Sequence, residues 1–170
     1  SVGALQTYEW AVRFPNMVKR AASIAGAPKP SPWTTLWLRT AIEEPVVSDP
    51  AWNNGFYTDP QTVQAGLRRQ AHVMALTLPP IGFYREDEEV WRSIVFISRD
   101  DFISRFWEAF MVPQDPNNLI TQSRKTRAAD PSSGGDLAAA LQQIKAKMFV
   151  IAFTGDMMFP PEECKRDAQR

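Results

Sequence analysis

The chain has 170 residues, of which 44% are hydrophobic and 22% are charged, a composition typical of a globular domain and unlike that of disordered or fibrous chains. The 19 lysine and arginine residues equal the 19 aspartate and glutamate residues in number. This balance gives no electrostatic reason to expect nucleic acid or an anionic membrane as a partner.

Targeting and redox signals are sparse. The single cysteine, Cys164, excludes an internal disulfide and a cysteine metal cluster, and it favours a reducing, cytoplasmic compartment. No apolar run approaches the roughly 20 residues needed to cross a bilayer. A secretory signal is not visible in residues 1–15, but the chain does not begin with methionine, so this carries little weight.

The first expected elements are a helix and a strand. Apolar side chains recur at helical spacing at Val2, Leu5 and Val12. The run ends at Phe14-Pro15. Residues 20–27 (RAASIAGA) are small and apolar, which is typical of a buried strand in a parallel sheet. Together they form half of an α/β unit.

From residue 28 to about residue 133 the sequence predicts helices separated by proline-bearing turns. Asp59-Pro60 and Asp115-Pro116 are typical helix starts, and residues 101–111 are rich in large apolar side chains. Tryptophans of this region are predicted to pack between helices; they are Trp33, Trp37, Trp52, Trp91 and Trp107.

The α/β pattern then returns. A helix is predicted from Gly134-Gly135-Asp136 through Ile144, the clearest strand covers residues 147–153 (KMFVIAF), and a last helix runs from residue 160 to residue 170. The predicted fold class is therefore α/β, with parallel sheet strands and flanking helices interrupted by a large helical cap, which is the plan of a capped α/β enzyme. The expected domains are a core piece over residues 1–28, a cap or lid over 29–133 and a second core piece over 134–170.

Two side chains are candidates for nucleophilic catalysis. Ser1 precedes a helix in S-V-G, which fits the second half of the G-x-S-x-G nucleophile turn, although a serine there is more often a helix cap. Asp156 follows the clearest strand, where the acid of a catalytic triad lies, although an aspartate there is also most often a cap. The one histidine, His72, lies mid-helix in the predicted cap and is interpreted as structural.

The motifs in sequence carry a resemblance. Residues 1–15 (SVGALQTYEWAVRFP) resemble the nucleophile helix of the homoserine O-acetyltransferase-like group of α/β-hydrolases. Further segments match that group in order along the whole chain: I-A-G-A at 24–27, D-P-A-W-N-N-G at 49–55 with Tyr57, G-L at 66–67, D-P-N-N-L at 115–119, I-K-A at 144–146 and D-M-M-F-P-P at 156–161.

The resemblance implies a partial α/β-hydrolase fold. It also implies that Ser1 is the nucleophile, that Asp156 is the triad acid and that the backbone N–H of Val2 serves the oxyanion hole. The triad histidine of the group would lie outside this chain, so the chain alone is expected to be inactive. The implied partners are a small acyl ester, or an acyl-CoA with an alcohol acceptor; a homo-oligomer stays open. No cofactor or metal is implied, with acetyl-CoA as co-substrate if the protein is a transferase.

Other readings stay open at this point. Gly3-Ala4-Leu5-Gln6 stands where acetyltransferases of the group usually carry G-G-M-Q, and Ala71 falls where a substrate-binding arginine is expected; the chain therefore looks closer to the ester hydrolases of the group. A non-catalytic remnant that serves as a binding or interaction domain is the alternative. A third reading, in which the amine of Ser1 is itself the base, is disfavoured because a helix follows the serine.

Overall fold

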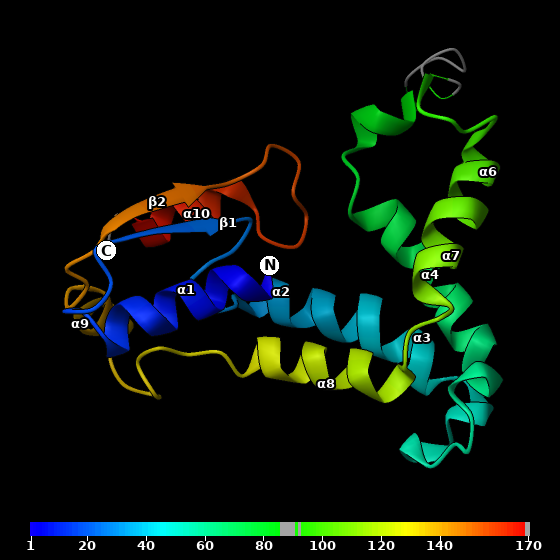
Figure 1. The fold of residues 1–170 in the computed structure, drawn as a ribbon, viewed down its shortest axis with the longest axis horizontal. Helices are drawn as coiled ribbons and strands as arrows, with labels where there is room; N and C mark the ends of the chain where they lie inside the picture. The colour runs from blue at the N-terminus through cyan, green and yellow to red at the C-terminus, as the bar shows by residue number, and fades with distance from the viewer. Residues whose placement is uncertain (86–90, 92, 169–170) are drawn as a thin grey trace. The chain divides into compact units, whose positions relative to one another are not determined.

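The computed structural model describes residues 1–85, 91 and 93–168, which fall into two units (Figure 1). Residues 1–35 and 125–170 form one unit, called here the sheet unit. Residues 36–124 form the other, called here the helical unit. These units are compact parts of the structure, and the domain boundaries expected after residues 28 and 133 stay predictions.

Two parallel strands and three helices build the sheet unit: α1 (Val2–Arg13), β1 (Arg20–Ile24), α9 (Leu137–Leu141), β2 (Lys147–Ile151) and α10 (Pro161–Ala168). The strands pair in parallel from Arg20 opposite Lys147 to Ile24 opposite Ile151, so both end at the same edge of the sheet (Figure 1). The structure thus confirms the predicted α/β class. β1 is shorter than expected, because Ala25, with φ of +49°, turns the chain out of the strand.

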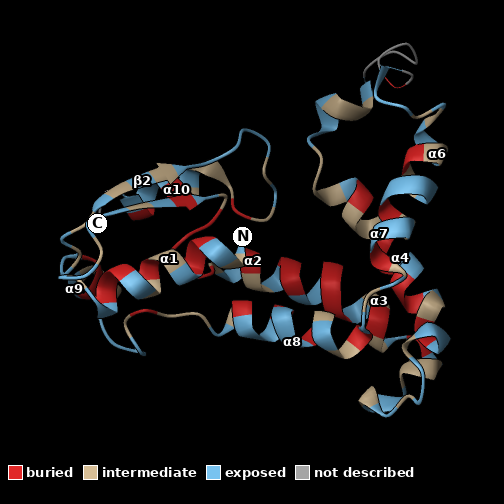
Figure 2. Cartoon of the chain, in the orientation of Figure 1, coloured by how far each residue is buried: buried red, intermediate tan, exposed pale blue. Residues whose placement is uncertain are grey.

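The helices of the sheet unit pack against one face of the two strands. Tyr8 and Val12 of α1 contact Leu141 of α9 and Val150 of β2, and a second cluster joins Leu5, Phe159 and Cys164 to the same strand. Burial therefore alternates along β2 (Figure 2). The prediction that the first strand is buried on both faces is wrong for this chain, since the described helices cover only one face.

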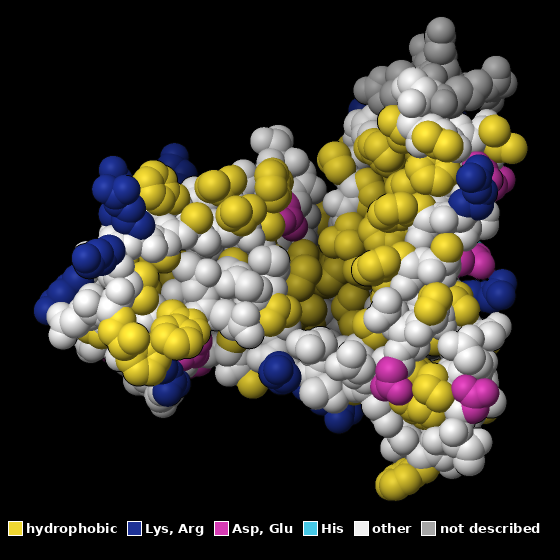
Figure 3. Space-filling model, viewed as in Figure 1, with side chains coloured by type: hydrophobic (Ala, Val, Ile, Leu, Met, Phe, Trp, Pro, Cys, Tyr) yellow, Lys and Arg dark blue, Asp and Glu magenta, His cyan; other side chains and the backbone are white. Residues whose placement is uncertain are grey.

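The opposite face of the sheet is apolar and exposed. Its side chains are Ile24 of β1 and Phe149 and Ile151 of β2, each 44–48% exposed. Figure 3 shows hydrophobic side chains gathered at the surface over β2. An exposed apolar sheet face of this kind is a site where further protein must pack or chains associate.

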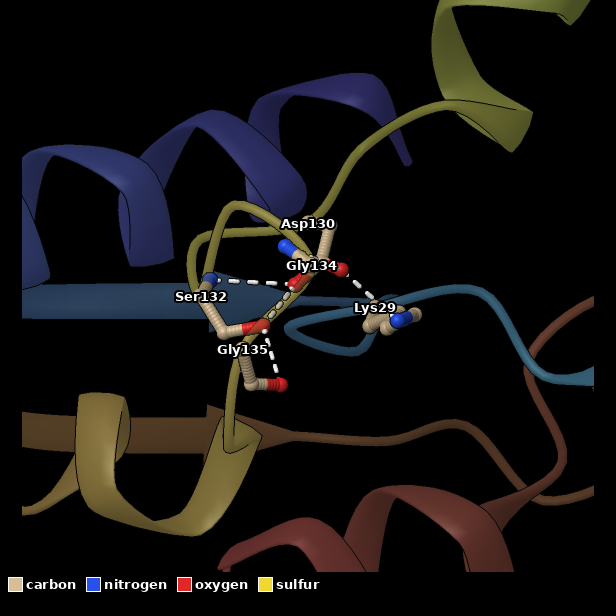
Figure 4. Close-up of polar contacts among 5 residues, drawn as sticks. All are labelled: Lys29, Asp130, Ser132, Gly134 and Gly135. Atoms are coloured by element: carbon tan, nitrogen blue, oxygen red, sulfur yellow. Dashed lines mark hydrogen bonds and ion pairs between the residues drawn. The ribbon is translucent and has the colours of Figure 1, made fainter.

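Lys29 and Asp130 tie together two loops of the sheet unit (Figure 4). Lys29 Nζ lies 2.7 Å from Asp130 Oδ2, and Asp130 Oδ1 accepts hydrogen bonds from the N–H and the hydroxyl of Ser132. Burial acts to raise the pKa of Asp130, but the hydrogen bonds from Lys29 and Ser132 outweigh it and hold that pKa at about 2. The segment that leaves β1 is thus fastened to the segment that leads to α9. The ion pair joins two residues that are roughly a hundred positions apart in the sequence.

The helical unit consists of helices and helical turns. They are η1 (Leu38–Glu43), α3 (Glu44–Val47), η2 (Pro50–Gly55), η3 (Pro60–Val63), α4 (Gln64–Thr77), η4 (Ile81–Arg85), α6 (Arg99–Phe102), η5 (Ile103–Glu108) and α7 (Ala109–Met111), while α2 (Pro32–Trp37) and α8 (Pro116–Arg127) cross its boundaries. The predicted helix starts are confirmed, because Asp59 and Asp115 each accept a backbone N–H hydrogen bond, from Gln61 and Asn118. Within the described ranges, each helix is too short or too polar to span a lipid bilayer.

Three of the five tryptophans predicted to pack between helices are buried, Trp37, Trp91 and Trp107, and Trp52 is half-buried. Trp91, Phe102 and Trp107 form one cluster with Ala71 and Met111. The prediction is wrong for Trp33, which lies in the sheet unit and is 43% exposed. Its indole N–H donates to the carbonyl of Met157 across 2.5 Å, which holds the ring at the surface instead of in a core.

Two of the motifs that carried the resemblance contact each other within the helical unit. Asn117 accepts a hydrogen bond from the indole N–H of Trp52 at 3.0 Å and donates one to the carbonyl of Gly55 at 2.9 Å. The hydroxyl of Tyr57 donates to Asp115 at 2.9 Å. These bonds fasten the turn at residues 49–57 to the start of α8, so this structure gives both motifs a structural use.

Candidate active site

Ser1 lies at the N-terminus of α1, beside the carboxyl end of β1. Its hydroxyl oxygen accepts a hydrogen bond from the N–H of Ala4 at 3.3 Å, as a helix-capping serine does, and donates one to the carbonyl of Ile24 at 3.0 Å. Its main-chain nitrogen donates to the carbonyl of Ala25. The side chain is therefore exposed at the edge of the sheet, where ligands of open α/β sheets bind.

Asp156 lies in the turn that follows β2. Its Oδ1 atom accepts hydrogen bonds from the N–H groups of Met158, at 2.8 Å, and Phe159, at 2.9 Å. These bonds fix the carboxylate in one orientation, as a local aspartate turn does. Asp156 is therefore a cap, as one interpretation predicted. Capping leaves room for a further hydrogen bond to another group, because a carboxylate has about four lone-pair sites.

Ser1 and the turn that carries Asp156 lie at the same edge of the sheet, the edge where both strands end. Ala25, just after β1, donates its N–H to the carbonyl of Ile151, the last residue of β2, at 2.9 Å. Burial lowers the pKa of the Ser1 amine, and the negative charge of Asp156 acts against that shift. Both predicted residues therefore lie at the carboxyl edge of the same strand pair, within the sheet unit.

Val2 is the first residue of α1. The first N–H groups of a helix have no acceptor inside the helix, and they carry the positive end of the helix dipole. An oxygen that gains negative charge beside Ser1 would therefore find a donor and a favourable potential there.

Two residues at the start of α2 support the turn that holds Asp156. The indole of Trp33 donates to the carbonyl of Met157, and the hydroxyl of Thr34, which is fully buried, donates to the carbonyl of Met158 at 2.8 Å. An open cavity of about 350 Å³ lies beside this turn, lined by Trp33, Thr154, Gly155, Asp156, Met157, Pro160, Pro161 and Glu162. The carboxylate therefore borders a space that a small molecule could enter.

His72 lies elsewhere, on α4 in the helical unit. Its Nε2 atom is 2.7 Å from Glu108 Oε1, and Arg68 binds the other oxygen of that carboxylate at 3.2 Å. These partners are on the exposed surface of a helix pair, which agrees with the structural interpretation of His72. Among the described residues, no group of three or more histidine, cysteine, aspartate or glutamate side chains could hold a metal ion.

Cys164 is a second nucleophilic atom near the site, on α10. Burial raises the pKa of its thiol, and the negative charges of Asp156, Asp167 and Glu163 raise it further. Its Sγ donates to the carbonyl of Gly26 at 3.4 Å. Because the reactive form of cysteine is the thiolate, this environment keeps Cys164 unreactive and leaves the serine as the candidate nucleophile.

Several residues that shape the site were not identified from the sequence. They are Ile24 and Ala25, whose carbonyls contact Ser1, together with Gly26, Trp33 and Thr34. A glycine just after a strand is a known sign of close backbone approach and could have identified Gly26. Main-chain carbonyls and residues of a separate helix leave no comparable sign in the sequence.

Comparison with known proteins finds relatives that are named as esterases and as O-acetyltransferases. A Corynebacterium glutamicum protein named "Probable esterase" is 42% identical over 168 residues, which cover 96% of this chain and 47% of that protein. The ethyl acetate hydrolase of Pseudomonas veronii is 40% identical, with 96% and 47% covered. The homoserine O-acetyltransferase of Methanobrevibacter ruminantium is 29% identical, with 97% and 36% covered.

A solved structure agrees with these relatives. The crystal structure of an acetylester hydrolase from Corynebacterium glutamicum superposes with a TM-score of 0.92 at 40% identity, and covers 98% of this chain and 48% of that one. The chain thus spans about half the length of the curated esterases it matches. No family model matches the sequence.

Proposed function

Because the chain belongs to the homoserine O-acetyltransferase-like group of α/β-hydrolases, we propose that it carries the nucleophile and the acid of a serine ester hydrolase. The observation that supports this most is the shared position of Ser1 and Asp156 at the carboxyl edge of one parallel strand pair. The chain acts, in this proposal, within a longer protein, called here the full-length protein, since it spans about half of its esterase relatives.

In the acylation step, Ser1 Oγ attacks the carbonyl carbon of a small ester. The hydroxyl proton passes to a base, and the tetrahedral oxyanion accepts a hydrogen bond from the N–H of Val2. The carbon–oxygen bond to the alcohol then breaks, and the alcohol leaves with that proton. Asp156 holds the base in the orientation and protonation state that the transfer needs.

The base is proposed to be a histidine of the full-length protein that lies outside residues 1–170. His72, the one histidine in the sequence, is on another unit and is already bound to Glu108. Without a base a serine hydroxyl is a weak nucleophile. The 170-residue chain by itself is therefore proposed to be inactive.

Water is the proposed acceptor of the acyl group. The two relatives named as an esterase and an ethyl acetate hydrolase are 42% and 40% identical, against 29% for the transferase. Ala71, where a substrate-binding arginine was expected, is fully buried, and an alanine there offers no charge to an amino-acid carboxylate. A short-chain ester such as an acetate is the proposed substrate.

Burst kinetics in the full-length protein test the proposal. With p-nitrophenyl acetate, the account predicts a burst of one p-nitrophenol per protein, and turnover that is lost by a factor of about 10⁴ to 10⁶ in Ser1→Ala. Ser98→Ala is the matched control, since Ser98 also caps a helix, accepting the N–H of Asp101 at 3.1 Å, in the helical unit. It should keep its activity.

Two results would contradict the proposal in different ways. A Ser1→Ala variant as active as its parent would end the assignment of the nucleophile. Transfer of the acetyl group to added homoserine, in preference to water, would leave the nucleophile in place and replace hydrolysis by acyl transfer.

A further inference from the structure

Gly26 lies where the loop after β1 passes the N-terminus of α1. A Cβ atom built on Gly26 would overlap the Cβ of Ala4 and would lie 3.3 Å from both the main-chain nitrogen and the carbonyl oxygen of Ser1. The φ angle of Gly26 is not in the left-handed region, so it is space, and not backbone conformation, that requires glycine here. A methyl group at position 26 therefore overlaps the methyl group at position 4, and without the latter it meets only the tight 3.3 Å contacts with Ser1.

The loop cannot move away freely to make more room. On its other side the carbonyl of Gly26 accepts a hydrogen bond from Cys164 on α10, and that side chain is 2% exposed. The preceding residue, Ala25, donates its N–H to Ile151 of β2. Close-packed interiors transmit such displacements instead of absorbing them.

The same loop holds the hydroxyl of Ser1. Ser1 Oγ donates to the carbonyl of Ile24, two residues before Gly26, at 3.0 Å, and accepts from the N–H of Ala4 at 3.3 Å. Both hydrogen bonds that orient the Ser1 side chain therefore come from the two segments that meet at the Ala4–Gly26 contact. A shift of the loop away from α1 would change the position of Oγ directly.

We propose that Ala4 and Gly26 form a size-complementary pair that sets the approach of α1 to β1 and so positions Ser1 Oγ for attack. Both are positioning residues; neither touches the substrate. The inference rests on the proposed function, because it names how this fold orients that nucleophile. The proposal also predicts compensation: the effect of adding a methyl group at position 26 should be relieved by removing the methyl group of residue 4.

A set of three variants of the full-length protein tests the pair: Gly26→Ala, Ala4→Gly and the double variant. The acylation rate is measured from the burst with p-nitrophenyl acetate, and the folded fraction of each variant is measured by circular dichroism. Gly26→Ala should lower the acylation rate about a hundredfold, with KM little changed, because small misplacements of a nucleophile have effects of that size. The double variant should recover to within about fivefold of the parent.

Gly82→Ala is the matched control, since a Cβ on Gly82 would meet nothing within 4 Å; it should acylate at the parental rate. Gly26→Ala as fast as the parent would overturn the pair, and so would a double variant as slow as Gly26→Ala. If Gly26→Ala does not fold, the double variant decides, because only a reciprocal pair predicts its recovery of both fold and rate. Should Ser1→Ala stay active, the proposed function itself fails and this inference fails with it.

Discussion

The hydroxyl of Ser1 donates a hydrogen bond to the carbonyl of Ile24 across 3.0 Å, which joins the first residue of the chain to the last residue of β1. The bond holds the side chain at the edge of the sheet where the turn carrying Asp156 also begins. It also means that the hydroxyl proton is occupied before reaction, so a catalytic base must displace Ile24 as its partner. A single conformation of the Ser1 side chain thus both caps α1 and presents the candidate nucleophile.

The two uses of Asp156 can be separated by substitution. Asp156→Asn keeps an oxygen that can accept from Met158 and Phe159, so its free energy of unfolding should stay within about 0.5 kcal/mol of the parent. It removes the charge that orients a histidine, so turnover of p-nitrophenyl acetate should fall about 10⁴-fold. Urea unfolding and steady-state rates of the full-length protein measure the two quantities.

Asp156→Ala is the companion variant. It removes the acceptor as well as the charge and should cost about 1 kcal/mol of stability in addition to activity. Equal activity in Asp156→Asn and the parent would show that this carboxylate is only a cap.

His72→Gln tests whether the base lies outside the chain. Glutamine can still donate to Glu108, which the histidine contacts at 2.7 Å on the exposed surface of α4. The full-length variant is therefore expected to hydrolyse ester at the parental rate, measured under saturating substrate. A loss of several hundredfold or more would make His72 part of the catalytic machinery and would contradict the proposed position of the base.

The contact between the two helical-unit motifs gives a stability prediction. Gly55 and Gly134 have nearly equal φ angles, +88° and +86°, but a Cβ on Gly55 would lie 3.0 Å from Asn117 Oδ1, while one on Gly134 meets nothing within 4 Å. Gly134→Ala should therefore cost only the left-handed strain, about 1 kcal/mol. Gly55→Ala should cost about 1 to 3 kcal/mol more, as measured by urea unfolding; equal losses would mean that the contact with Asn117 is unimportant.

The pair Lys29 and Asp130 predicts a pH dependence of stability. The pKa of Asp130 is held at about 2, below its ordinary value of 3.8, so the folded protein prefers the charged form. The stabilisation is complete above the unfolded pKa of about 4 and is lost as the pH falls from about 4 to about 2. The difference in unfolding free energy between the parent and Asp130→Asn should therefore shrink over that range, in urea titrations at several pH values. A difference that stays constant would argue against the ion pair.

Much of the fold could be predicted from local signals. The start of the long helix at Asp59-Pro60 and the start of α8 after Asp115 follow from capping chemistry, which acts over a few residues. The strand at Lys147 was identified because its apolar run stands between a helix and a turn. The parallel pairing of β1 and β2 was expected from the order of the elements and is confirmed.

The rest depends on contacts between distant parts of the sequence. The first strand was expected to be buried on both faces, but the described helices cover one face, and a hydrophobic pattern alone cannot show what packs on the other. Trp33 was assigned to a core because tryptophans usually are, whereas its indole binds a carbonyl 124 residues away. The contact between Gly26 and Ala4 joins the loop after β1 to the first turn of α1, and no periodic pattern in the sequence marks it.

Mass mapping of a covalent adduct tests the central claim most directly. A fluorophosphonate reacts with the activated serine of the full-length protein by forming a bond from Oγ to phosphorus as fluoride leaves, and peptide mass spectrometry then locates the label. The account predicts one label per protein, on Ser1, with loss of esterase activity in proportion to labelling and no label in Asp156→Ala. A label on another residue, or complete inactivation with Ser1 unmodified, would contradict the account.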